Sequence, residues 1–375
     1  MKLTVTIARI LVGTLFVFSG LIKAIDPLGL AYKMQEFFEA WMGDHSNPTS
    51  LLHWFHDHVL MFSILMITLE VALGVALLIG WQKKFITWIL LLLMLFFLFL
   101  TSYVLFSGKI RACGCFGDCI PLTPMQTFTK DVILLVLIIF LLIKRKYIMP
   151  VIKSIHLVTI VLLSVILTVL LQSNALEHLP IKDCLPYKIG NNLLELRKMP
   201  ADATFDKFNY SFTYKKGNEE KEFTTDNLPD STWQFVAQNK MLIEKGNDKL
   251  PAINDFSLTS MNGNDSTEAI LGQNGEYYLY FIKSFDEAAV NWQYGFMQLQ
   301  AKAKQQGRNI YVVTADTEKI FDFFNKKNNF NVTVFTCDAT AIKTAARCVP
   351  TIFFMKGPVV LGKWSWEDID EAMRN

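Results

Sequence analysis

Three of the six cysteines lie within seven consecutive residues, in the sequence CGCFGDC at residues 113–119. The glycine between Cys113 and Cys115 lets the backbone fold tightly enough to bring two sulfurs together, although with strain that makes the bond readily reducible. Cys119 would then be a third thiol for relay. Basic residues just before the loop would stabilise a thiolate, which is the reactive form of cysteine. The loop therefore predicts thiol–disulfide chemistry at Cys113, Cys115 and Cys119.

Other uses of the same three cysteines remain open. The loop could hold a static disulfide with one spare thiol. It could also bind zinc, with a fourth ligand from elsewhere in the chain. An iron–sulfur cluster would need a fourth cysteine close by.

The loop lies between two of five apolar runs, each close to the ~20 residues that a membrane-spanning helix needs. The runs are about Leu3 to Ile22, Val59 to Ile79, Phe85 to Phe106, Phe128 to Ile143 and Ile155 to Leu171. The first run could be a secretory signal peptide. We expect a retained helix, because its apolar part exceeds the ~7 to 15 residues of a signal-peptide core and no A-x-A-like site follows.

Basic residues in short loops predict the orientation, since such loops stay in the cytoplasm. Lys83 and Lys84 separate the second and third runs, and residues 144–153 between the fourth and fifth runs are also basic. The amino terminus is then cytoplasmic, and everything after about residue 173 is periplasmic. All six cysteines fall on the periplasmic face, where disulfides persist. We therefore expect a multi-pass protein of the inner membrane of a Gram-negative-type cell.

A polar loop joins the first two runs. Residues Leu28 to Met42 place apolar side chains at a helical period, which suits a helix lying on the membrane surface above the cysteine loop. His53, His56 and His58 follow, at a spacing that could bring imidazoles together on a metal. The other interpretation is a solvated helix start, and we predict no metal site.

Two ionisable residues lie within the apolar runs, Arg9 in the first and Glu70 in the second. A lone charge at this depth costs several kcal/mol unless it is paired or neutralised. Glu70 is thus either a functional carboxylate or a structural tie, bonded to Arg9 or protonated.

Residues 3 to 145 resemble the DoxX family of small four-helix membrane proteins. The resemblance rests on Phe18-Ser19-Gly20-Leu21-Ile22-Lys23 with Asp26-Pro27, and on Glu70-Val71-Ala72-Leu73-Gly74. The cysteine loop is similar to that of the MauE branch, which is associated with disulfide formation in periplasmic proteins. A fifth helix and a large carboxyl-terminal region depart from that family.

The region after the fifth run reads as a soluble domain. Phe208 to Tyr214 and Lys221 to Thr225 alternate around Lys-Gly-Asn, which predicts a hairpin. From about residue 252 strands and helices alternate, which predicts an α/β domain. The predicted strands are Tyr277 to Ile282, Ile310 to Thr314, Val332 to Phe335 and one that opens at Val349-Pro350-Thr351, and the predicted helices are Ala288 to Gln305 and Ile320 to Asn325.

Residues 250 to 375 resemble thioredoxin, specifically the membrane-tethered TlpA-like group. Asn254 to Leu258 is similar to the leading strand, and the resemblance implies a cis-proline at Pro350. Where the family carries Cys-x-x-Cys, this chain reads Lys283-Ser284-Phe285-Asp286-Glu287. An ordinary thioredoxin reaction at that position is therefore excluded.

Cys337 and Cys348 are the remaining cysteines of this domain. A bridge between them would close a loop of about a dozen residues and stabilise by about 3 kcal/mol in the chain-entropy estimate. They could form that structural disulfide, act as a redox pair, or be free buried thiols. The partner of Cys184, which precedes the domain, is left open.

We therefore expect a transmembrane bundle at 1–147, a fifth transmembrane helix at 148–175, a periplasmic connecting segment at 176–249 and a degenerate thioredoxin-like domain at 250–375. The favoured function is thiol–disulfide exchange with periplasmic thiol proteins, with quinone as a candidate membrane acceptor. The rival is a non-catalytic, membrane-anchored assembly or binding protein with structural disulfides. The net charge of +2 without a basic stripe gives no argument for nucleic acid.

Overall fold

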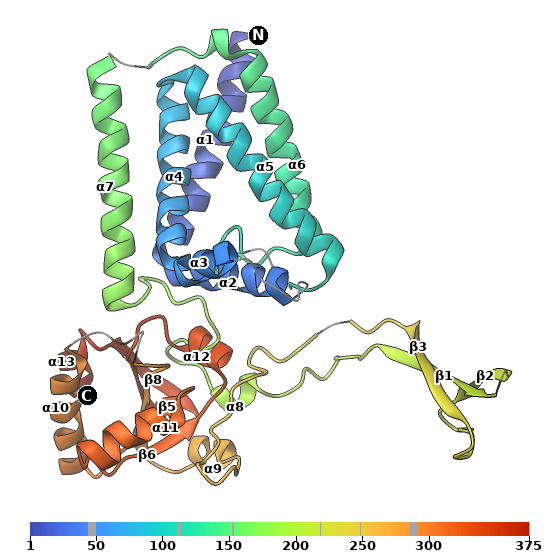
Figure 1. Ribbon diagram of the computed structural model, residues 1–375. Helices are drawn as coiled ribbons and strands as arrows, with labels where there is room; N and C mark the ends of the chain where they lie inside the picture. Colours follow the sequence, from blue (N-terminus) through green and yellow to red (C-terminus); the bar gives the residue numbers. More distant parts are fainter. Residues whose placement is uncertain are drawn as a thin grey trace.

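The computed structural model describes residues 1–43, 50–110, 114–151, 154–217, 219–247, 249–285, 288 and 291–374. Within these residues, five helices are long and apolar enough to cross a membrane (Figure 1). They are α1 (Lys2–Ile25), α4 (Val59–Ile79), α5 (Lys83–Ser107), α6 (Pro124–Ile143) and α7 (Ser154–His178). The prediction of a membrane helical bundle is confirmed, and each helix covers one of the five apolar runs.

Helices α1 and α4 pack closely because glycines meet where they cross. A Cβ atom on Gly74 would lie 2.9 Å from the carbonyl oxygen of Gly13. Small residues of this kind let membrane helices approach without steric conflict. Helix α7 runs along α4 (Figure 1), and the side-chain amide of Gln172 donates to Thr68 Oγ1 at 3.0 Å.

The two ends of the bundle differ. Helices α2 (Pro27–Gly43) and α3 (Ser50–Asp57) lie across the end that faces the carboxyl-terminal domain (Figure 1). Helix α2 matches the surface helix that the apolar period predicted. The short 3-10 helix η1 (Arg145–Tyr147) and the basic loops lie at the opposite end. The cysteine loop ends where Thr123 and Gln126 form a capping box at the start of α6.

The carboxyl-terminal domain is built on a five-stranded sheet of order β6-β5-β4-β7-β8. Its strands are β4 (Glu276–Phe281), β5 (Asn309–Thr314), β6 (Thr333–Thr336), β7 (Thr351–Lys356) and β8 (Val359–Ser365). Strands β4, β5 and β6 are parallel, whereas β7 and β8 are antiparallel to their neighbours. The predicted α/β domain is confirmed.

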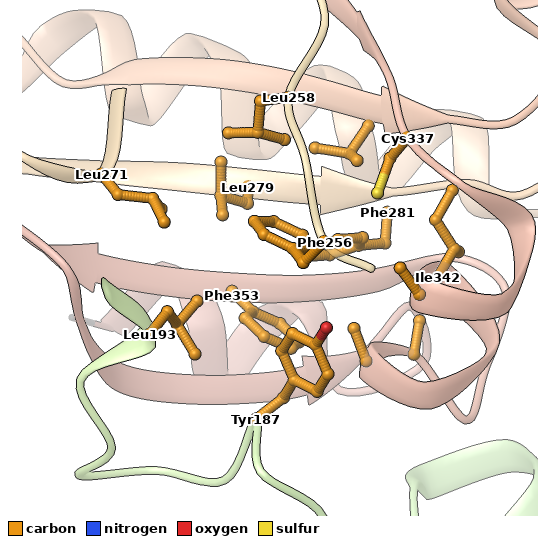
Figure 2. Close-up of a cluster of buried hydrophobic side chains, with 14 of the residues drawn as sticks. Tyr187, Leu193, Phe256, Leu258, Leu271, Leu279, Phe281, Cys337, Ile342 and Phe353 are labelled. Atoms are coloured by element: carbon orange, nitrogen blue, oxygen red, sulfur yellow. The ribbon is translucent and has the colours of Figure 1, made fainter. Parts of the chain in front are cut away.

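Helices cover both faces of this sheet. Trp292 and Phe296 of α10 fill one face, and Ile342 of α12 belongs to the cluster on the other. Figure 2 shows that second cluster, where Tyr187 of the connecting segment packs beside Phe353. The helices of this region are α8 (Leu193–Leu196), α9 (Thr267–Leu271), α10 (Trp292–Gln305), α11 (Thr317–Phe321), the π-helix η2 (Asp322–Lys327), α12 (Ala339–Ala345) and α13 (Ile369–Arg374).

The predicted leading strand at Asn254 to Leu258 is wrong. Phe256 and Leu258 are buried in the core, but the backbone there forms no named strand, and Thr259 just after it makes isolated bridges to Asp265 and Thr336. The segment thus contributes side chains to the core without joining the sheet.

A second, three-stranded sheet lies apart from the rest of the protein (Figure 1). It consists of β1 (Lys207–Lys216), β2 (Glu219–Thr224) and β3 (Gln234–Glu244) in the order β2-β1-β3. Strands β1 and β2 form the predicted hairpin. The backbone N–H of Asn247 donates to the carbonyl oxygen of Thr204 at 3.1 Å, so the two connecting segments meet at the base of the sheet.

Candidate functional site

Cys115 lies at the centre of a tight turn at the end of the bundle. The N–H of Gly117 donates to the carbonyl oxygen of Gly114 at 2.9 Å, and both glycines have positive φ values of 58° and 71°. Residues with a Cβ atom rarely adopt this backbone conformation, so the glycines of the CGCFG sequence shape the loop. Cys113 lies outside the described residues.

Cys115 is half-buried and lines two hollows at once. The first, which we term the membrane cavity, has a volume of about 50 Å³ and extends into the bundle. The second, the loop cleft, has a volume of about 90 Å³. The membrane cavity is lined by Leu15, Phe16, Ser19, Lys23, Leu30, Glu70, Met94, Phe97, Leu100, Cys115, Phe116, Lys130, Asp131 and Leu134. The loop cleft is lined by Lys33, Gly114, Cys115, Phe116, Gly117, Asp118, Ile120, Pro121, Leu122 and Thr127.

Two oppositely charged pairs face the membrane cavity. Lys23 pairs with Glu70, and the two side chains are 4% and 3% exposed. Lys130 Nζ lies 2.7 Å from Asp131 Oδ1. Charges at this depth are stable only when paired, and with all four groups ionised the cavity is neutral.

The predicted tie between Glu70 and Arg9 is wrong. Arg9 Nη1 donates to the carbonyl oxygen of Met149 at 2.8 Å, at the opposite end of the bundle. Arg9 and Lys23 are 14 positions apart on α1, which is about 21 Å along a helix axis, and it is Lys23 that reaches Glu70. Sequence reasoning missed Lys130 and Asp131, although adjacent opposite charges at the start of a membrane helix were a signal.

A disulfide links the cysteine loop to the connecting segment. Cys119 is bonded to Cys184, with the two Cα atoms 4.9 Å apart. Cys119 is therefore not the spare thiol that we predicted for relay. The bond forms because the chain after α7 returns across the end of the bundle (Figure 1), a path that the sequence did not reveal.

Arg347 holds the carboxyl-terminal domain against the same loop. Its Nε donates to Asp26 at 2.8 Å, and its Nη2 donates to Asp118 at 2.7 Å. Burial works to lower the pKa of Arg347, but the two carboxylates outweigh it and raise the pKa above its ordinary value. One buried guanidinium thus joins the α1–α2 junction, the cysteine loop and the residues that precede β7.

The Val349–Pro350 peptide bond is cis, as the thioredoxin resemblance implied. Of the three alternatives for Cys337 and Cys348, the structure shows the third, since both are buried free thiols and no disulfide joins them. Cys337 projects into the apolar cluster of Figure 2, whereas Cys348 Sγ donates to the carbonyl oxygen of Leu176 in α7 at 2.9 Å. Burial raises the pKa of each thiol to about 12.

The two residues before the cis-proline, Cys348 and Val349, also border a groove between the domain and the bundle. This interdomain groove has a volume of about 720 Å³ and is mostly apolar. Its lining includes Leu28, His56, Leu176, Cys348, Val349 and Trp366. The groove could accommodate an extended chain, and the thiol in its described lining, Cys348, is held protonated by its raised pKa.

The histidines that follow α2 make separate contacts. His56 Nε2 lies 2.9 Å from Gln35 Nε2, and His58 Nδ1 lies 2.8 Å from the carbonyl oxygen of Trp54. Over the part of the chain that the structure describes, no three His, Cys, Asp or Glu side chains converge as metal ligands. The histidine and zinc alternatives have no support among those residues.

Comparison with known proteins places residues 1–144 with the methylamine utilisation protein MauE. Residues 208–245, which form the three-stranded sheet, match a domain of unknown function, DUF8463. Protein TlpB of Flavobacterium psychrophilum is 30% identical over 197 residues, which is 50% of this chain and 50% of that protein. The chain thus spans about half the length of the curated relative it matches. The predicted combination is confirmed: a multi-pass, MauE-like membrane domain is followed by an α/β domain, and the chain is similar to a protein named TlpB.

Proposed function

We propose that this protein carries out thiol–disulfide exchange at Cys115, with partner thiol proteins on the periplasmic side of the inner membrane. The observation that carries the proposal is the position of Cys115 in the wall between the loop cleft and the charged membrane cavity. A partner sulfur can approach from the cleft, while the cavity supplies charged groups behind the reacting atom.

The proposed orientation has two independent supports. The Cys119–Cys184 disulfide lies at one end of the bundle, and such bonds persist outside the cytoplasm. Lys83 and Lys84 lie at the opposite end, as expected for cytoplasmic loops. A periplasmic reporter fused after residue 375 should be active, and one fused near Arg145 should be inactive. The reverse pattern would place every cysteine on the wrong side.

The exchange proceeds through a mixed disulfide. The thiolate of Cys115 attacks one sulfur of the partner disulfide, whose S–S bond breaks, and the other partner sulfur leaves as a thiolate that takes a proton from water. Cys113 then attacks Cys115 in the mixed disulfide, which forms a Cys113–Cys115 bond and releases the second partner thiol. Two electrons pass from the loop to the partner, and the reverse sequence returns them.

In this proposal the carboxyl-terminal domain is a clamp and a partner-binding surface. Its cis-proline segment rests on α7 through Cys348, and Arg347 holds it to the loop. With no Cys-x-x-Cys in the sequence and with pKa values of about 12 for Cys337 and Cys348, the domain has no thiol suited to exchange. The interdomain groove would bind the partner chain.

Quinone does not fit the membrane cavity in this state. Sites for small molecules usually have volumes of ~300–1,000 Å³, whereas the cavity beside Cys115 has about 50 Å³. We derive no step through quinone, and exchange with a partner protein needs none.

The test is exchange in membranes, with mixed disulfides trapped by a maleimide and identified by mass spectrometry. Cys115→Ser should abolish trapping, while Cys337→Ala, which removes a thiol buried in the apolar core of the carboxyl-terminal domain, should retain it. Both variants should keep the Cys119–Cys184 bond, which reports correct assembly. Undiminished exchange in Cys115→Ser would favour the rival function, a membrane-anchored assembly or binding protein with structural disulfides.

A further inference from the structure

Asp131 is the least satisfied charged group of the membrane cavity. Its side chain is 1% exposed, and Lys130 Nζ lies 2.7 Å from Oδ1. Within the described residues Oδ2 has no hydrogen-bond partner, and the contact to Oδ1 comes from the adjacent residue on α6, where side chains do not face each other well. A buried carboxylate is costly unless its oxygens accept hydrogen bonds. Asp131 therefore lacks the partners that a purely structural carboxylate would have.

The cavity has room for water beside Asp131. Its volume of about 50 Å³ exceeds the ~10–15 Å³ that one water molecule requires. The ionisable groups that face Asp131 are Lys130 of α6, Lys23 of α1, Glu70 of α4 and Cys115 of the loop. Helix α5 contributes only the apolar residues Met94, Phe97 and Leu100. A short chain of water can thus join the Asp131 carboxylate to the Cys115 sulfur.

We propose that Asp131 accepts the proton of the Cys115 thiol through water in the membrane cavity. The S–H bond of Cys115 breaks, the proton passes to the Asp131 carboxylate, and the sulfur keeps the electron pair with which it attacks the partner disulfide. When the reverse exchange releases the Cys115 thiolate, the proton passes back from Asp131 to that sulfur. This inference rests on the proposed function, because it assigns the proton of that exchange.

The neighbouring charges suit this role. Lys130 interacts electrostatically with both Cys115 and Asp131, and its Nζ lies 4.9 Å from the centre of the Phe116 ring. It can therefore stabilise the negative charge on either side of the transfer. Glu70 is less suited to accept the proton, since Lys23 is already bonded to it.

If Asp131 acted only as a fixed negative charge, its removal would have the opposite effect on the reactivity of Cys115. A fixed carboxylate near a thiol disfavours the thiolate, because like charges repel. Removing only a charge should therefore make Cys115 more reactive, whereas removing a proton acceptor should make it less reactive. The direction in which Asp131→Asn changes the reactivity of Cys115 therefore distinguishes the two roles.

The experiment measures the rate at which dithiodipyridine modifies Cys115 in the full-length protein in membranes, quantified on the Cys115 peptide between pH 6 and 9. Because the proton is shared within the pair, the wild-type rate should stay nearly flat from pH 6 to 8. In Asp131→Asn the rate at pH 6 should fall at least about tenfold and then rise about tenfold per pH unit, as for an isolated thiol. Asp131→Glu should keep the flat profile.

Asp57→Asn is the matched control, since it makes the same chemical change in α3 outside the cavity. An intact Cys119–Cys184 bond shows that each variant assembles. An unchanged or faster rate in Asp131→Asn overturns the inference, and so does a wild-type rate that rises tenfold per pH unit, whether or not the variant folds. Either result would leave exchange at Cys115 standing. Wild-type Cys115 that does not react at any pH after prior reduction of the loop would instead overturn the proposed function.

Discussion

Cys115 and Cys348 both lie where the helix bundle meets the carboxyl-terminal domain, yet their surroundings are opposite. Cys115 is half-buried between a cleft and a charged cavity. Cys348 is 2% exposed, donates to the carbonyl oxygen of Leu176, and has its pKa raised by burial to about 12. In a thioredoxin, a position beside the cis-proline belongs to the reactive surface. In this protein, Cys348 at such a position contacts helix α7 instead.

The difference between the two thiols follows from charge and solvent. Cys115 has the Lys130 ammonium nearby, which favours a thiolate. Around Cys348, burial dominates, and the nearby carboxylates Asp368 and Asp26 oppose ionisation further. Under the proposed function, thiol exchange takes place at the membrane loop and the thiols of the carboxyl-terminal domain do not take part.

The largest expected effect is the difference in alkylation rate between Cys115 and Cys348. At pH 7.5 a thiol with a pKa near 12 has ~10³-fold less thiolate than one with an ordinary pKa of ~8.5. We therefore expect a membrane-permeant maleimide to alkylate Cys115 at least about 10³-fold faster than Cys348, measured by mass spectrometry of the two peptides. Rates within a factor of ten of each other would remove the distinction on which the proposed function rests.

Features that depend on local pattern were predictable from the sequence. Five apolar runs gave α1, α4, α5, α6 and α7, and a helical period gave α2. Lys-Gly-Asn indicated the hairpin of β1 and β2. Each of these is decided locally by hydrophobicity or backbone geometry. The cis bond before Pro350 was implied by the resemblance to thioredoxin.

The pairings that build the site were not predictable in the same way. Cys119 and Cys184 are 65 residues apart, and Arg347 is 321 residues from Asp26. Lys23 belongs to a motif that we recognised, but its partner depends on how α1 lies against α4. Such pairings follow from tertiary packing, which one sequence without its fold does not specify.

The next prediction concerns Arg347, which ties the two regions together. Arg347→Ala leaves the carboxylates of Asp26 and Asp118 without their cation, and breaking a buried ion pair in this way typically costs ~3–5 kcal/mol. The domain should release α7 and expose Cys348. We expect the alkylation of Cys348 to accelerate at least about 100-fold, as measured by mass spectrometry of the Cys348 peptide.

Lys356→Ala is the control for Arg347→Ala. Lys356 is 65% exposed and lies 3.9 Å from Glu276, and an exposed pair of this kind contributes only ~0–1 kcal/mol. Its removal should leave the protection of Cys348 unchanged. If Arg347→Ala also left Cys348 protected, the domain would be held by other contacts and Arg347 would not be the clamp.

A smaller effect is expected from alkaline pH. Burial raises the pKa of Cys348 from its ordinary value of 9.0 to about 12. Below pH 9 the thiol is protonated in both the folded and unfolded states, so its contribution to the free energy of unfolding is fully present. Above pH 9 only the unfolded thiol ionises, and stability falls by up to ~1.4 kcal/mol per pH unit until about pH 12. Thermal unfolding at pH 8, 9 and 10 should show this loss in the wild type.

Cys348→Ala isolates that contribution. Cys337 has its pKa raised in the same direction, but it is present in both proteins and cancels in their difference. The variant should therefore lose stability with pH less steeply than the wild type. Equal slopes would mean that Cys348 ionises as readily in the folded protein as in the unfolded chain, so that it is not protected by α7.

The smallest effect should come from removing the three-stranded sheet. Residues 206–245 can be deleted by joining Phe205 to Gly246, because Thr204 and Asn247 are already hydrogen-bonded to each other and would flank a two-residue turn with glycine at its second position. The sheet lies away from both Cys115 and Cys348 (Figure 1), so the deletion should change stability by less than ~0.5 kcal/mol, as for a surface change far from the core. The alkylation rates of both thiols should stay within about twofold of the wild type. Faster alkylation of Cys348 would show that the sheet helps to hold the domain on the bundle, whereas unchanged rates with slower exchange toward a protein partner would assign the sheet to partner binding.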